Sequence, residues 1–223
     1  MNSFHLSKRL QALANMIDDN ITVYDVGCDH AYLDIYLTLY KHNKCIAIDA
    51  KKSVVSIAKN NISKFNLNIP VLLNDGLEEL NVSKNSLVVI AGMGTRTILK
   101  ILKDKDISNV LIQSNDDLPH LRKMLSIWGY KITREEVIYD NKYYYVFIKA
   151  IRGNISYTKE QVLLGPLLML DPSNQIYIMY LNHLSKKYIK MINNVPKEFI
   201  SEKEELLNNS KIIDNYLYNC TKK

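Results

Sequence analysis

The chain has 223 residues, of which 47% are hydrophobic and 23% charged, and its formal net charge at pH 7 is +6. Such a chain can bury a full core and is not disordered; it has no run of 18 apolar residues and no apolar signal segment at its start, so we expect a cytoplasmic protein without a membrane partner. Its three cysteines form neither a C-x-x-C pair nor a cluster with histidines, which argues against disulfides and predicts no metal, while the positive charge favours a polyanionic partner.

The apolar pattern predicts a helix followed by alternating strands and helices. The first helix covers residues 3–18, with Ser3 as a candidate N-cap. Strands 131–139 and 143–150 lie so close together that they must form a hairpin. This order predicts a doubly wound α/β sheet whose last strand is antiparallel. The other expected strands are 22–26, 44–48, 70–73, 86–91 and 109–113, and the other expected helices are 32–41, 51–65, 95–104 and 117–128.

Beyond Gly165 the sequence contains long helical segments and no strand pattern. Apolar residues recur with heptad spacing in two stretches separated by residues 193–196, which predicts an antiparallel helical hairpin or coiled coil. We therefore expect two domains, residues 1–155 and 156–223. The expected seam residues are Tyr177, Leu181, Leu184, Tyr188, Met191 and Val195 in the first stretch and Phe199, Leu206, Ile213 and Cys220 in the second.

The most informative segment is residues 25–33, where a strand ends at a glycine and a helix follows. Gly27 permits a tight turn, so a ligand could lie against the carboxyl end of the strand. The dinucleotide fingerprint G-x-G-x-x-G would need glycine where Asp29 and Tyr32 stand. Because a carboxylate repels a pyrophosphate but attracts an ammonium or a sulfonium, NAD is disfavoured. An ordinary strand–turn–helix in which Asp29 caps the helix is the remaining alternative.

Acidic residues follow the next two strands as well. An acid in the position of Asp49, at the end of the second strand, can bind both hydroxyls of a ribose. Asp75 lies in the segment 74–77 after the third strand, where its carboxylate and the backbone amides could read an adenine edge. Together with Asp25 and Asp29, these acids are expected at one edge of the sheet, and they favour a ligand that contains a nucleoside.

Four segments together resemble one family. They are Asp25 to Leu33, Asn74 to Leu77, Ala91 to Gly94 and Leu163 to Pro166. Over essentially its whole length the chain is similar to the bacterial tRNA (adenine-N1)-methyltransferases that modify adenine 22 in the D-loop, the TrmK family. The resemblance implies a Rossmann-like class I methyltransferase fold, S-adenosyl-L-methionine (AdoMet) as cofactor and S-adenosyl-L-homocysteine as product. It also implies tRNA as the partner, bound by the C-terminal helices, and we expect a monomer.

The resemblance also implies site residues. Asp29 and His30 are expected beside the methionine end of the cofactor and the target base, and Arg9 is expected to pair with the cofactor carboxylate. The loop 91–94 offers no polar side chain or ring for the base, so Asn115 joins Asp29 and His30 as an expected catalytic residue. The expected cofactor-binding residues are Arg9, Asp25, Gly27, Asp29, His30, Asp49, Ala50, Asn74, Asp75, Gly76, Ala91, Gly92 and Met93.

Two residues depart from the family pattern. Thr95 stands where a second glycine commonly follows Gly-Met-Gly, and we expect it to cap the next helix. Ser114 replaces the proline of Gln-Pro-Asn, which removes a backbone constraint just before Asn115.

Three functions stay open at this point. They are tRNA adenine-N1 methylation, methylation of a small molecule or protein, and non-catalytic RNA binding, because cofactor motifs do not identify the acceptor. Residues 143–145, three successive tyrosines, could stack RNA bases or pack the edge of a strand. Lys186, Lys187 and Lys190 could likewise bind phosphates or form a solvated face.

Overall fold

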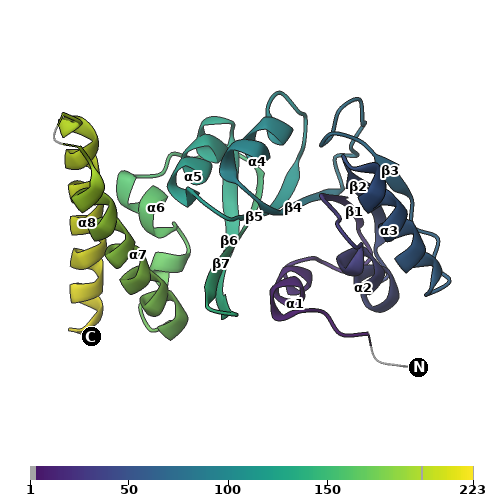
Figure 1. The fold of residues 1–223 in the computed structure, drawn as a ribbon, viewed down its shortest axis with the longest axis horizontal. Coiled ribbons are helices and arrows are strands. Elements are labelled where there is room, and N and C mark those ends of the chain that lie inside the picture. The colour runs from purple at the N-terminus through teal and green to yellow at the C-terminus, as the bar shows by residue number, and fades with distance from the viewer. Residues whose placement is uncertain (1–3, 197, 223) are drawn as a thin grey trace.

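The computed structural model describes residues 4–196 and 198–222 and contains a seven-stranded sheet with the order β3-β2-β1-β4-β5-β7-β6 (Figure 1). All paired strands are parallel except β7, which is antiparallel to both of its neighbours. The predicted α/β class with an antiparallel last strand is confirmed. The strands are β1 (Thr22–Val26), β2 (Lys44–Asp49), β3 (Val71–Leu73), β4 (Leu87–Met93), β5 (Asn109–Ser114), β6 (Tyr130–Asp140) and β7 (Tyr143–Arg152).

Helices cover both faces of the sheet. The two faces correspond to two apolar clusters, one with the first three helices and one with the fourth to eighth. Strand β1 lies between β2 and β4, so the chain reverses its direction of winding there, and the carboxyl ends of β1 and β4 form the usual ligand crevice of such sheets. The helices are α1 (Lys8–Asn15), α2 (Tyr32–Lys41), α3 (Lys52–Ser63), α4 (Thr95–Leu102), α5 (Leu118–Ile127), α6 (Lys159–Leu164), α7 (Gln175–Asn194) and α8 (Ile200–Cys220), and a 3-10 turn η1 covers Leu168–Leu170.

Helix α1 is shorter than the predicted helix 3–18. It begins after Ser7, whose hydroxyl accepts a hydrogen bond from the Leu10 amide at 3.3 Å. The expected cap Ser3 lies outside the described residues. At the other end, the Lys41 ammonium donates to the carbonyls of Ala14 and Ile17. The Ala14 carbonyl also accepts from the Ile17 amide at 3.1 Å, and the lysine on α2 adds a donor where α1 ends.

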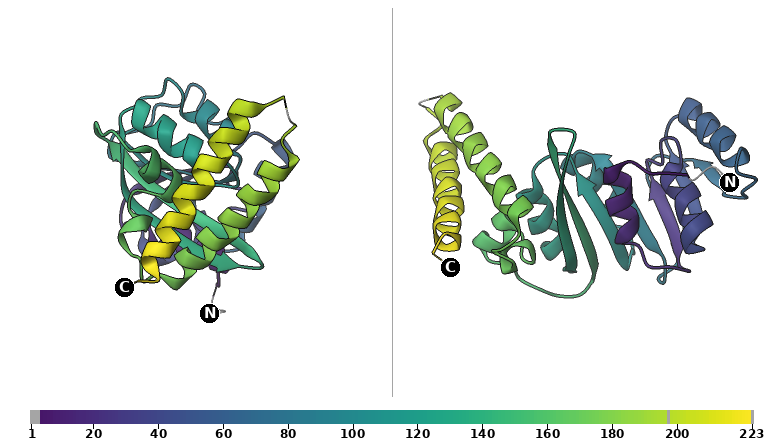
Figure 2. Two further views of the ribbon diagram at one scale, coloured as in Figure 1. Left: turned by 90° about the vertical axis from the view of Figure 1, so that its left-hand side faces the viewer. Right: turned by 90° about the horizontal axis from the view of Figure 1, so that it is seen from below.

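The predicted hairpin of α7 and α8 is confirmed, and it lies at one end of the long axis of the molecule (Figures 1 and 2). The heptad seam holds near its base, where Tyr177, Leu181 and Ile213 are fully buried. It fails toward the tip, where Met191 is 42% exposed and Phe199 is 47% exposed, because only the base reaches the apolar core of the sheet. No helix in the described part of the chain is long and apolar enough to cross a membrane.

A buried ion pair connects the sheet to the segment that leads into the hairpin. The side chains of Arg122 and Glu135 are 0% exposed, with 2.8 Å between Arg122 Nε and Glu135 Oε1. Arg122 Nη1 also donates to the carbonyls of Val162 and Leu163, and Glu135 Oε2 accepts from the Leu167 amide at 2.9 Å. Two side chains of the sheet domain thus bind the backbone on both sides of Gly165.

Gly165 is required at this place for two reasons. Its φ of +100° is a conformation that side chains disfavour, and a Cβ there would lie 2.8 Å from Arg122 Nη2 and 3.0 Å from Glu135 Oε2. We call Arg122, Glu135 and Gly165 the joint. The joint gives a structural reason for the Leu163–Pro166 motif, which lies far from the cofactor motifs in the sequence.

Candidate active site at the strand ends

The turn after β1 closes against the ends of two neighbouring strands. The amides of Gly27 and Cys28 both donate to the Ile48 carbonyl, at 2.8 and 3.0 Å. Gly27 has a φ of +82°, and a Cβ there would collide with the methyl end of Met93. The turn after β1 and the Met93 side chain of β4 therefore lie against each other, and the positive φ at position 27 is a conformation that glycine adopts without strain.

Asp29 and His30 lie on this turn and are exposed. Helix α2 begins only at Tyr32, and its N-cap is Ala31, which makes no side-chain cap. The alternative in which Asp29 caps the helix is therefore wrong. Asp29 instead has a φ of +50°, its side chain is 77% exposed, and its Oδ1 lies 3.7 Å from His30 Nε2. An exposed carboxylate in a disfavoured backbone conformation is a common feature of functional sites.

Beneath the turn lies a pair of buried carboxyls that sequence reasoning found only in part. Asp25 was predicted, but Asp34 on α2 was not, and both are fully or almost fully buried. Burial raises the pKa of Asp25 to about 6, partly offset by a hydrogen bond from Asp34 and by the Arg9 charge. Burial and the neighbouring Asp25 raise the pKa of Asp34 well above its usual range. Burial therefore favours the protonated form of both carboxyls. The signal in the sequence that could have identified Asp34 is an acid within an otherwise apolar helical stretch.

A hydrogen-bond network joins α1 to the ends of β4 and β5. Gln113, 1% exposed, accepts with Oε1 from Arg9 Nη1 and from the Gly92 amide, both at 3.1 Å. Its Nε2 donates to Asn115 Oδ1 at 3.0 Å, and Asn115 Nδ2 donates to the Gly92 carbonyl at 2.8 Å. Sequence reasoning missed Gln113; an amide at the end of a buried strand was the only signal. The network holds Arg9, Gly92 and Asn115 in one arrangement.

Thr95 and Ser114, the two departures from the family pattern, contact each other. Their hydroxyl oxygens lie 2.8 Å apart, and each lies within hydrogen-bond distance of the Asp116 carbonyl, at 2.8 and 2.9 Å, so one hydroxyl can donate to the other while the second donates to the carbonyl. The N-cap of α4 is Gly94, so the expectation that Thr95 caps the helix is wrong. Since the Asn115 amide also donates to the Met93 carbonyl at 2.9 Å, hydrogen bonds hold this loop without a proline.

Asp49 and Asn74 lie at neighbouring strand ends. Asp49 Oδ1 accepts from the Lys51 amide at 2.9 Å, across the exposed Ala50, and the Asp49 carbonyl accepts from the Asn74 amide at 3.0 Å. Asn74 Nδ2 donates to the Glu78 carbonyl, whereas Asn74 Oδ1 is buried and has no hydrogen-bond partner among the described residues. A buried acceptor without a donor is costly, so this oxygen indicates a place for a ligand donor or a water.

Asp75 is exposed and forms an ion pair with Lys100 on α4, at 3.2 Å. The next residue, Gly76, is buried with a φ of +69°, and a Cβ there would lie 3.0 Å from Ile101. The adenine-reading position predicted for Asp75 therefore lies where the β3 loop meets α4.

A cleft at the end of β1 brings part of the predicted set together. It is lined by Arg9, Asp25, Gly27, Asp29, His30 and Ala91, with apolar residues between them, and we call it the strand-end cleft. Asp49 and Asn115 do not line it, and Asp75 lines a different cavity of about 390 Å³ beside α4. No group of histidine, cysteine or acidic side chains that could hold a metal occurs among the described residues.

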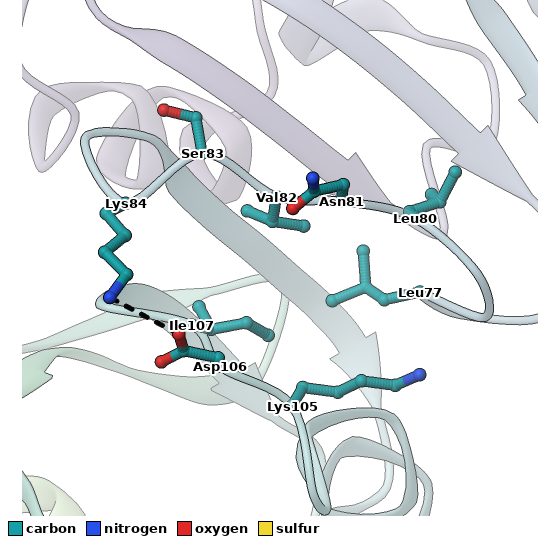
Figure 3. A pocket seen from close by; sticks show the side chains of 9 residues that line it. All are labelled: Leu77, Leu80, Asn81, Val82, Ser83, Lys84, Lys105, Asp106 and Ile107. Carbon is teal, nitrogen blue, oxygen red and sulfur yellow. Dashed lines mark ion pairs between the residues drawn. The ribbon is translucent and has the colours of Figure 1, made fainter.

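Another cavity, of about 350 Å³, meets the cofactor motifs only at Leu77 (Figure 3). It opens between residues 77–84 and 105–107, and Leu77, Val82 and Ile107 form its apolar part. Lys84 and Asp106 form an ion pair at 3.5 Å on one side. Both of these groups are exposed and already paired, so nothing in this cavity calls for a ligand, and the strand-end cleft remains the candidate active site.

The fold and the strand-end cleft define a Rossmann-like methyltransferase, and a family model described as a methyltransferase domain matches residues 6–148. The Bacillus subtilis tRNA (adenine(22)-N(1))-methyltransferase is 31% identical over 180 residues, which are 77% of this chain and 76% of the relative. The structure of M. capricolum TrmK in complex with S-adenosyl-homocysteine is 30% identical, with a TM-score of 0.81 over 95% of this chain and 97% of that one. A Streptococcus agalactiae protein of the NADB-Rossmann superfamily has a TM-score of 0.87, with 26% identity over 97% of this chain and 99% of that one. This chain belongs to the TrmK family of tRNA methyltransferases.

Proposed function

We propose that this chain transfers a methyl group from AdoMet to N1 of adenine 22 in the D-loop of tRNA and so forms 1-methyladenosine. The observation that carries the proposal is the likeness to the B. subtilis enzyme named for this reaction, across 77% of the chain. The complex of M. capricolum TrmK with S-adenosyl-homocysteine supports AdoMet as the cofactor. Bound AdoMet supplies an electrophilic methyl group on a sulfonium.

The strand ends offer groups that fit this cofactor. Asp49 has one carboxylate oxygen bonded to the Lys51 amide, which leaves the other for ribose hydroxyls. Asp75 and the unpartnered Asn74 oxygen would take the adenine end. Arg9 lines the strand-end cleft and would meet the cofactor carboxylate, with Gln113 holding the guanidinium in place. These residues, with the others predicted from the sequence, are the proposed cofactor-binding set.

The proposed reaction needs orientation and charge stabilisation more than a base. Adenine N1 attacks with its own lone pair, the sulfur–methyl bond breaks as the nitrogen–methyl bond forms, and the positive charge passes to the base. Asp29, exposed in the cleft with His30 beside it, would stabilise this charge. Asn115 already bonds Gly92 and Gln113, so we propose that it holds the loop beneath the base.

We further propose a division of labour between the two parts of the chain. Residues 1–155 would bind AdoMet, and residues 156–223 would bind the body of the tRNA. The exposed Lys186, Lys187 and Lys190 on α7 supply positive charge for phosphates. We also propose that the protein is a cytoplasmic monomer.

The test is nucleoside analysis of unmodified tRNA after incubation with the protein and AdoMet. We expect 1-methyladenosine at position 22, and none in a tRNA with guanine at that position. If several adenine-22 tRNAs acquire no 1-methyladenosine, the proposal is wrong. Methyl transfer that survives RNase treatment of the acceptor would instead indicate a protein or small-molecule substrate, and failure to bind AdoMet in calorimetry would indicate a non-catalytic RNA-binding protein.

A further inference from the structure

The β6–β7 hairpin extends past the rest of the sheet at the edge that carries the strand-end cleft. Strand β5 pairs with β7 only from Asn109↔Ile151 to Gln113↔Phe147. Residues 143–146 therefore project beyond the carboxyl end of β5. The Lys8 ammonium on α1 donates to the carbonyl of Tyr139 in this projecting part, at 2.7 Å. The tip of the hairpin thus lies between α1 and α7, as Figure 1 shows.

The turn at this tip fixes which side chains it presents. Asp140 pairs with Tyr143, and the two residues between them, Asn141 and Lys142, have φ values of +47° and +71°. Positive φ at both central residues is the signature of a tight two-residue hairpin turn that matches the strand twist. The register is therefore fixed, with Tyr143 at the extreme end of β7 and Lys142 beside it.

One face of the tip is already covered. Tyr139 and Tyr144 are a cross-strand pair whose ring centroids lie 4.8 Å apart. Tyr144 in turn contacts Tyr180 at 5.7 Å and His183 at 5.4 Å, both on α7. These rings pack the hairpin tip against the C-terminal helices. Tyr144, the middle one of the three successive tyrosines, therefore has a structural role.

The other face is open. Side chains alternate along a strand, so Tyr143 and Tyr145 share this second face. The Arg9 guanidinium lies 5.9 Å from the centroid of the Tyr145 ring. Tyr143 is 66% exposed, and no aromatic partner for it occurs among the described residues. The open face therefore carries an exposed ring and a partly covered one, with Arg9 of the strand-end cleft against the second.

We propose that Tyr143, supported by Tyr145 and flanked by Lys142, is a stacking platform for an unpaired base of tRNA next to the target adenine. The proposal rests on the proposed function. Extruding one base into a pocket leaves its neighbour without a stacking partner, and an exposed ring restores that contact for any base. The charges agree with this occupant, because Lys142 adjoins Tyr143 and Lys8 on α1 contacts the hairpin at Tyr139, against one acid, the cross-strand partner Asp140, so that lysines can meet a phosphate beside the base.

The experiment compares Tyr143→Ala, Tyr143→Phe and a matched control, Tyr40→Ala, in the full-length protein. Tyr40 is a similarly exposed tyrosine, at 50%, but lies on α2, outside the strand-end cleft and outside the proposed tRNA-binding part. The probe is an unmodified adenine-22 tRNA with 2-aminopurine at position 21 or 23, read by fluorescence and by titration. We expect Tyr143→Ala to weaken tRNA binding roughly 5- to 100-fold and to lose the quenching of 2-aminopurine. Tyr143→Phe should behave like the wild type because stacking uses the ring, and Tyr40→Ala should change nothing.

AdoMet affinity, measured by calorimetry, should be the same in all four proteins. Unchanged tRNA binding in Tyr143→Ala would overturn the proposal, and so would equal weakening in Tyr143→Phe, which would assign the effect to the hydroxyl. The failure of the proposed function is a separate result, because the wild type would then form no 1-methyladenosine. Wild-type methylation together with normal tRNA binding by Tyr143→Ala would reject the platform alone.

Discussion

Glu135 and Asp29 are both carboxylates carried by the same sheet, but their surroundings are opposite. Glu135 is fully buried and bonds to Arg122 and to the Leu167 amide. Asp29 is 77% exposed, and the nearest cation-forming group is His30 at 3.7 Å. A carboxylate whose oxygens are all used holds the structure together, whereas one left open at a strand end is available to a ligand. Asp25 and Asp34 are a third kind: both are buried, each affects the pKa of the other, and burial raises both pKa values.

The strongest test of this contrast removes one half of the joint. Glu135→Leu leaves the Arg122 guanidinium buried without its counter-charge, so the free energy of unfolding should fall by about 3–5 kcal/mol. Urea denaturation measures the loss. The double variant Arg122→Met/Glu135→Leu is the control, and it should recover much of the stability because no unpaired charge remains. A single variant as stable as the wild type would show that the joint is not structural.

The buried pair predicts a dependence of stability on pH. Its carboxyls have folded pKa values above the unfolded ones, so the stabilisation is complete below the unfolded pKa and is lost as the pH rises through the folded value. For Asp25, from 3.8 to about 6, this loss amounts to about 3 kcal/mol, since one pKa unit corresponds to about 1.4 kcal/mol.

The control for this prediction is Asp34→Asn, which keeps a donor for Asp25 but removes one titrating group. Above a pH of about 6 its unfolding free energy should be level, while that of the wild type continues to fall. Thermal unfolding at several pH values compares the two proteins. Parallel curves for both would mean that Asp34 does not hold a proton in the folded protein.

Asp49→Ala tests whether an open strand-end acid binds the cofactor. It removes the proposed contact with the ribose hydroxyls, so AdoMet binding should weaken by about 1.5–3 kcal/mol. Calorimetry gives the affinity, and circular dichroism confirms that the fold is intact. The matched control is Glu79→Ala, because Glu79 is an exposed acid in the loop after β3. Equal affinity in wild type and Asp49→Ala would make Asp49 an ordinary loop residue.

Asp29→Asn should have the smallest effect on binding and a selective one on rate. Asparagine tolerates the positive φ of this position, so the turn should keep its shape. Because the lost charge matters most as the base becomes cationic, single-turnover methylation should slow by at least about tenfold, or 1.4 kcal/mol, while AdoMet still binds. If affinity and rate fall together by the same factor, Asp29 acts on the cofactor alone.

The order of the elements could be predicted because apolar residues recur in each strand and helix of the sheet domain with the spacing of that element. A glycine or polar residues then end the element. The acids at the strand ends follow from the same local signals. The C-terminal end of the N-terminal helix could not be predicted, since the Lys41 ammonium that bonds the carbonyls there comes from another helix. Heptad spacing also failed at the hairpin tip, because spacing shows a shared face but not whether a core reaches it.

The contacts that complete the site join residues far apart in the chain. Gln113 bonds Arg9 across 104 positions, and Thr95 bonds Ser114 across 19. Nothing local marks such partners. Ser114 shows the effect clearly: as a single residue it is only a missing proline, whereas in the fold its hydroxyl and that of Thr95 hold the loop before Asn115.

The joint also has a consequence for the way a large substrate is selected. The buried ion pair and its bonds to two backbone carbonyls and an amide tie the segment before α7 to the sheet, so they favour one direction in which α7 and α8 leave the sheet. An RNA held on those helices would place a base in the cleft only if that base lay at a matching distance from the part of the RNA that the helices hold. Little ordering entropy would then be lost on docking, and a base at the wrong distance along the RNA would not reach the cleft.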